Sequence, residues 1–163
     1  MSTTQIITLN QLIKLFNDFS DDHFQLNDFG YGDTSEIGTS RKMEFPYLWI
    51  THRTPSRINV TNKTAIPQFT LTVVVADQLS DIENVGDDNG SASNNEQEIL
   101  SDMFQVLQDF VTYISTSLGV YGVQLTEDAV SVEPVHDETT DKVSGWIADF
   151  TINLRHSNCI LPI

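Results

Sequence analysis

Two segments of the chain carry apolar residues at intervals of three and four, which is the periodicity of an amphipathic α-helix. The first segment, about Leu9 to Phe19, follows Thr8 and Gln11, which have the spacing of a capping box. The second and longer one begins after Asn94 or Asn95. Gly119 is its expected end. The apolar stripe of this second helix contains Ile99, Leu100, Met103, Phe104, Val106, Leu107, Phe110, Val111, Ile114 and Leu118.

Other segments alternate apolar and polar residues, which is the period of a β-strand. The predicted strands are 24–29, 45–52, 69–77, 120–125, 130–136 and 146–154. The segment 69–77 has apolar or threonine side chains on both faces, so we expect it at the centre of the sheet. In 146–154, one face is apolar and the other mostly polar, which predicts one buried and one solvated face.

The predicted element order is α, β, β, β, α, β, β, β. It indicates an α+β fold, with a mainly antiparallel β-sheet and two α-helices packed on one face. We expect residues 1–163 to form a single domain with exposed loops at about 30–44 and 78–95. Trp49 and Trp146 are expected between sheet and helices, and Asn59, Asn62 and Asn89 in turns.

The composition is that of a folded but strongly acidic protein. The 163 residues are 39% hydrophobic, with 8 Lys plus Arg against 23 Asp plus Glu and a formal net charge of −15. Such a charge disfavours sequence-specific nucleic-acid binding and anionic membranes, which are bound through clustered bases. The N-terminus lacks the pattern of a secretory signal, and Cys159 is the single cysteine. These features favour a protein partner and a reducing, cytosolic setting.

The charges are segregated along the chain. Five of the eight bases lie within 41–63, against Glu44 alone, whereas 64–141 contains fifteen acids and no Lys or Arg. A basic segment in an acidic molecule suits head-to-tail contact between identical subunits. The candidate interface residues are Arg41, Lys42, Arg53, Arg57 and Lys63 on the basic side, and Asp87 and Asp88 on the acidic side.

The sequence contains only weak motifs for metal binding or catalysis. Aligning Gly90 with the invariant glycine of an EF-hand places Asp87, Asn89 and Glu96 at calcium-ligand positions, but Val85 then occupies the first ligand position and has no side-chain oxygen. These three residues are weak calcium candidates, and no other metal or cofactor is expected. No nucleophile elbow or phosphate-binding loop occurs, so we expect no enzyme activity. His136 with nearby carboxylates is the alternative acid–base group.

The C-terminal half resembles a known family. A strand runs into an Asp-containing loop and then a helix that begins Asn-Glu-Gln-Glu-Ile-Leu-Ser-Asp-Met, from Asn95 to Met103. A strand pair, Gly145-Trp146 with an alternating strand, and a tail from Cys159 to Pro162 follow. This pattern and the element order are similar to tail-terminator and tail-completion proteins of tailed bacteriophages, found at the head-tail junction.

The resemblance implies a non-enzymatic virion structural protein, made in the host bacterial cytoplasm and located in the tail or neck. It implies a ring homo-oligomer, usually a hexamer, stacked between neighbouring neck and tail proteins, and it supplies no catalytic or ligand-binding residues. A calcium- or small-ligand-binding module that uses the acidic 78–96 loop is the alternative function. If DNA passes through such a ring, a negative lumen would repel its phosphates.

Overall fold

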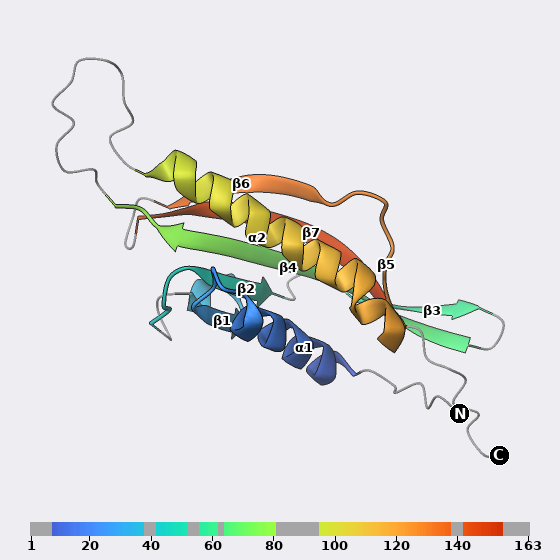
Figure 1. Ribbon diagram of the computed structural model, residues 1–163. Helices are drawn as coiled ribbons and strands as arrows, with labels where there is room; N and C mark the ends of the chain where they lie inside the picture. The colour runs from blue at the N-terminus through green and yellow to red at the C-terminus, as the bar shows by residue number, and fades with distance from the viewer. Residues whose placement is uncertain are drawn as a thin grey trace, which may run out of the picture.

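In the part of the chain that the structure describes, seven strands form one mostly antiparallel sheet, and two α-helices lie on one of its faces (Figure 1). The computed structural model describes residues 8–37, 42–51, 56–61, 64–80, 95–137 and 142–154. The architecture is the α+β fold, with helices on one face of the sheet, that the hydrophobic pattern predicts.

Both predicted helices are confirmed, but the first continues past Phe19 to Asp22, whereas the second ends at Thr116, before the last apolar residue of its stripe, Leu118. Helix α1 spans Leu9–Asp22, and Thr8 and Gln11 form the expected capping box. Helix α2 spans Glu96–Thr116, with Asn95 at the N-cap position but no side-chain cap bond. Gly119 does not end the helix as predicted. The chain continues as a 3₁₀-helix η2, Leu118–Tyr121, and Gly122 takes the left-handed conformation at its end (φ 80°).

The strands are arranged around two long central ones. Their bounds are β1 Asp28–Tyr31, β2 Tyr47–Thr51, β3 Arg57–Thr61, β4 Thr64–Gln78, β5 Val123–Leu125, β6 Ser131–Asp137 and β7 Val143–Leu154. The main order is β1-β2-β4-β7-β5, with β3 also paired to β4 and β6 also paired to β7. Only the β1–β2 pair is parallel among the described pairings.

Strand β4 occupies the centre of the sheet, as its apolar residues on both faces predict. It pairs with β2 and β3 along one edge and with β7 along the other. Leu71, Val73 and Val75 belong to the main core on the helix side. Val74 and Ala76 are buried on the opposite face.

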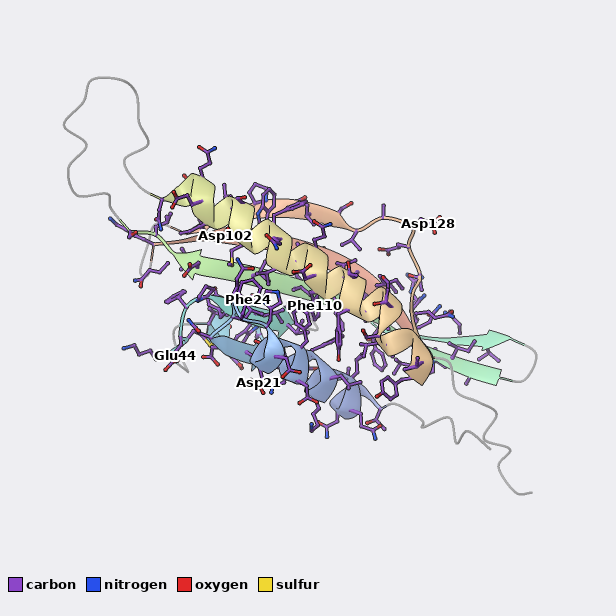
Figure 2. The ribbon with its side chains drawn as sticks, viewed as in Figure 1. Asp21, Phe24, Glu44, Asp102, Phe110 and Asp128 are labelled. Carbon is purple, nitrogen blue, oxygen red and sulfur yellow. The ribbon has the colours of Figure 1, made fainter. Side chains whose placement is uncertain are left out.

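The main core lies between the sheet and both helices. Phe110 of α2 is fully buried, and its ring contacts Phe16 of α1 and Phe150 of β7 at centroid distances of 5.0 and 6.1 Å. Figure 2 shows the Phe110 side chain between the two helices. Edge-to-face contacts of this kind add stability beyond the apolar area that they bury. One aromatic cluster therefore holds α1, α2 and the sheet together.

A second, smaller core covers the opposite face of the sheet near β2. Trp49 lies here with Met43, Tyr47 and Val143, so its predicted place between sheet and helices is wrong. Alternation along β2 sends Trp49 to the face opposite Leu48 and Ile50, which join the main core. Trp146 lies on the helix side as predicted, where its indole Nε1 donates to the Leu100 carbonyl at 2.7 Å.

Several strand boundaries differ from the sequence pattern, and β4 begins at Thr64 instead of Phe69. The expected strand at 24–29 is replaced by a turn at Phe24, which is 84% exposed, and β1 begins only at Asp28. Helix α1 continues to Asp22, so the chain must turn before it can join the sheet. The strand expected over 120–125 is shortened to β5, because η2 takes up its first residues.

The predicted loops at 30–44 and 78–95 are partly structured. Gly30 and Tyr31 belong to β1, residues Thr34–Glu36 form a 3₁₀-helix η1, and Met43 is buried. The first of these loops is therefore not wholly exposed. Gln78 still belongs to β4, and residues 81–94 lie outside the described part of the chain.

Candidate functional site

Strand β3, Arg57–Thr61, lies outside the strands that the hydrophobic pattern predicts. It pairs with the first part of β4 from Arg57↔Gln68 to Thr61↔Thr64. Asn59 therefore lies in a strand and not in the predicted turn, while Asn62 and Asn89 lie outside the described residues. The alternation of Ile58 and Val60 with polar neighbours was the signal that could have revealed this strand.

The β3–β4 hairpin extends beyond the rest of the sheet. Strand β7 pairs with β4 no further than Asn153↔Gln68, so within the described residues the segment 64–67 has only β3 beside it. Figure 1 shows the hairpin reaching past the ends of both helices. The hairpin thus presents both of its faces outside the packed layers.

One face of this hairpin is apolar and exposed. The exposed fractions of Ile58 and Val60 are 69% and 75%, and their cross-strand partners are Pro67 and Ala65. Partners in an antiparallel pair share a face, so these four residues form one strip. An exposed apolar strip on an edge strand favours association with another chain.

The basic residues of 41–63 do not form one described surface. Lys42 and Arg57 are both exposed. Arg57 pairs opposite Gln68 of β4. Lys42 lies near the other end of β4, because its neighbour Met43 packs beside Tyr47. Tyr47 pairs opposite Ala76 of β4. Eight residue steps along β4 correspond to about 26 Å at ~3.3 Å per residue, so the structure does not bring these two bases together. Arg41, Arg53 and Lys63 lie outside the described residues, as do Asp87 and Asp88.

A groove of about 460 Å³ runs between α2 and the segment 125–132, which includes the connection from β5 to β6. Its apolar lining is formed by Phe104, Leu107, Val111, Leu125, Val130 and Val132. Thr112, Glu127 and Asp128 also line it, and all three are exposed. Figure 2 shows Asp128 on the outer connection between β5 and β6. Neither the described lining of the groove nor the sequence from 64 to 141 contains Lys or Arg. The groove is therefore apolar inside and acidic at its rim.

The histidine considered for acid–base chemistry has a carboxylate partner. His136 Nδ1 of β6 lies 3.0 Å from Glu96 Oε1 at the start of α2. Both side chains are about one-third exposed, at 38% and 37%. Glu96 was also the third calcium candidate, while Asp87 and Asn89 lie outside the described residues. Within the described ranges, no group of three or more His, Cys, Asp or Glu side chains could hold a metal ion.

Asp77 is a half-buried carboxyl near the end of β4. Burial raises its pKa above the ordinary 3.8, and the negative charge of Asp102 on α2 acts in the same direction. The backbone N–H of Gln78, which donates to Asp77 Oδ1 at 2.7 Å, acts against this rise. Relative to the unfolded chain, the folded state therefore disfavours the ionised form of Asp77.

This shift predicts a pH-dependent effect of Asp77→Asn. A carboxyl whose pKa is higher in the folded state binds its proton more tightly there. The stability that this proton binding contributes is present below the unfolded-state pKa and is lost as the pH rises through the folded-state pKa. We expect the variant to be more stable than the wild type at neutral pH, with the difference vanishing below pH 3.8. Urea unfolding across this pH range measures the difference. The control, Asp102→Asn, removes only the Coulomb contribution to the pKa shift of Asp77 and should have a smaller effect. A stability difference for Asp77→Asn that does not change with pH would contradict the raised pKa of Asp77.

The described part of the chain contains no helix that is long and apolar enough to cross a membrane. No protein-family model matches the sequence, and no curated protein matches it. The fold and the surfaces described above define an α+β sheet protein with a projecting hairpin and an apolar groove that has an acidic rim.

Proposed function

We propose that this protein is a non-enzymatic structural subunit of a tailed-phage virion, which assembles with copies of itself into a ring at the head-tail junction or tail end. The observation that carries the assembly is the projecting β3–β4 hairpin, with Ile58 and Val60 exposed on a basic segment. Monomeric proteins seldom leave neighbouring β-branched side chains on an exposed edge strand, because such strands associate.

The position of the ring in a virion rests on the resemblance of the segment from Asn95 to the C-terminal tail to tail-terminator proteins. Two helices on one face of a mainly antiparallel sheet agree with the fold that this resemblance implies. The same resemblance suggests six subunits and contacts with neighbouring neck and tail proteins. The acidic surface of the protein would repel the phosphates of DNA that passes through such a ring and keep the DNA from adhering.

Self-assembly is tested by placing charges on the hairpin. The wild-type protein should sediment as a species larger than a monomer at low salt and high protein concentration. The double variant Ile58→Asp, Val60→Asp should remain monomeric, because it replaces the apolar strip by two carboxylates. The control is Phe24→Asp, which places one carboxylate, half the added charge of the double variant, on an 84%-exposed apolar residue in the turn after α1. Sedimentation velocity measures all three.

A wild-type protein that stays monomeric at every salt and protein concentration would overturn the proposed self-assembly. For the location, antibody raised against the protein can be applied to purified particles of the phage that encodes it. We expect labelling at the neck or the tail. Particles without any label would overturn the virion assignment while leaving the sedimentation result intact.

A further inference from the structure

We propose that the groove between α2 and the segment 125–132 receives the β3–β4 hairpin of a second copy of this chain. This inference rests on the proposed function, since it names the two surfaces through which neighbouring subunits would meet. Both surfaces are built from described residues; the strip is exposed in the single chain, and the apolar lining of the groove ranges from Phe104, 44% exposed, to Leu107, 2% exposed.

The two surfaces match in polarity. Ile58 and Val60 extend from the projecting hairpin, and the interior of the groove is lined by side chains such as Leu107, Val111 and Val132. Contact between them would remove apolar area from water on both sides, which is the main driving force of association.

The two surfaces are opposite in charge. Arg57 is exposed at the start of β3, on the hairpin face opposite Ile58 and Val60, and the sequence 52–63 contains three Lys or Arg and no acid. Glu127 and Asp128 lie at the groove, and none of its described lining residues is Lys or Arg. Opposite charges at the rim of a contact favour encounter and fix the orientation of the partners. This complementarity selects the hairpin of another copy over an acidic or uncharged partner segment.

The contact would be head-to-tail. The hairpin belongs to β3 and β4, while the groove belongs to α2 and the segment beside β5 and β6. A subunit that inserts its hairpin into a neighbour still has its own groove free for the next subunit. Repetition of one such contact closes into a ring when the rotation between neighbours divides a full turn.

The test fills the groove and leaves the hairpin unchanged. Thr112→Trp places a large side chain at the groove, whereas Thr116→Trp places the same side chain one turn further along α2, outside the lining. The two threonines are closely matched, since both are exposed and each donates its hydroxyl to the carbonyl four residues earlier. Circular dichroism and thermal unfolding confirm that both variants fold. Under conditions in which the wild type assembles, we expect Thr112→Trp to be monomeric and Thr116→Trp to assemble like the wild type.

Mixing variants identifies the occupant of the groove. Thr112→Trp retains its hairpin, and Ile58→Asp, Val60→Asp retains its groove, so the mixture should form a 1:1 complex and nothing larger. About 1 M salt, where the Debye length is about 3 Å, should weaken this complex. If Thr112→Trp assembles as the wild type does, the inference is overturned and the proposed self-assembly stands. If Thr112→Trp is monomeric but the mixture forms no complex, the groove receives something other than the hairpin. A monomeric wild type overturns both proposals.

Discussion

Phe110→Ala is expected to lower the free energy of unfolding by about 3–5 kcal/mol. The Phe110 side chain is fully buried and lies between α1 and α2 (Figure 2). Its ring contacts Phe16 and Phe19 of α1 at 5.0 and 5.2 Å and Phe150 of β7 at 6.1 Å. Truncation removes these contacts and leaves a cavity where two helices and the sheet meet. Since natural domains are stable by about 5–15 kcal/mol, much of the total would be lost.

Urea unfolding followed by circular dichroism measures this effect. The matched control is Phe24→Ala, the same substitution at a side chain that is 84% exposed. Exposed substitutions of this kind usually change stability by no more than about 0.5 kcal/mol. Similar midpoints for the two variants would contradict the central place of Phe110 in the core.

Gly145→Ala is the second change with a large expected effect. A Cβ atom at Gly145 would lie 2.0 Å from the Val75 carbonyl oxygen and 2.7 Å from Ala76 Cα. Both atoms belong to the backbone of β4, and β6 flanks Gly145 on its other side through Val135. Neither neighbour can move without disturbing the centre of the sheet. We expect destabilisation of about 3 kcal/mol, at the upper end of the usual range for overpacking.

Gly119→Ala provides the control, because among the described residues no heavy atom outside its own stretch of chain lies within 4 Å of the position of its added Cβ. This variant should be neutral, or slightly stabilised because alanine restricts the unfolded chain more than glycine does. Thermal unfolding of both variants measures the contrast. A Gly145→Ala protein that melts at the wild-type temperature would show that β4 and β7 tolerate a wider separation than the structure has.

The hydrophobic pattern predicted the elements that pack on a large core. Helix α1, helix α2 and strands β4 and β7 each bury a continuous apolar face, and their side chains repeat with the period of their own backbone. The pattern failed where burial is small. Strand β3 is exposed at every residue from Arg57 to Val60, so its short alternation carried little weight beside the neighbouring proline and asparagines. The opposite error occurred at Phe24, where the pattern predicts a strand and the structure has a turn, because a single aromatic residue need not be buried.

The candidate surfaces were predictable only in part. Charge segregation gave Arg57 as an interface candidate, but it did not separate Arg57 from Lys42, which lies near the other end of β4. The groove gave no sequence signal of its own. Val111 is one of ten positions in a regular helical stripe, and Val130 and Val132 appear as part of an ordinary strand. Their meeting depends on how β5 and β6 both pair with β7.

By itself, the sequence determined the α+β class, the two amphipathic helices, the central strand and the separation of basic from acidic segments. These properties follow from local periodicity and composition, which involve residues close together in the chain. Tertiary structure alone decided that Trp49 and Trp146 lie on opposite faces of the sheet, that the β3–β4 hairpin extends past β7, and that α2 and the segment 125–132 enclose a groove. Each of these depends on strand register, because a shift of one residue moves every side chain to the other face.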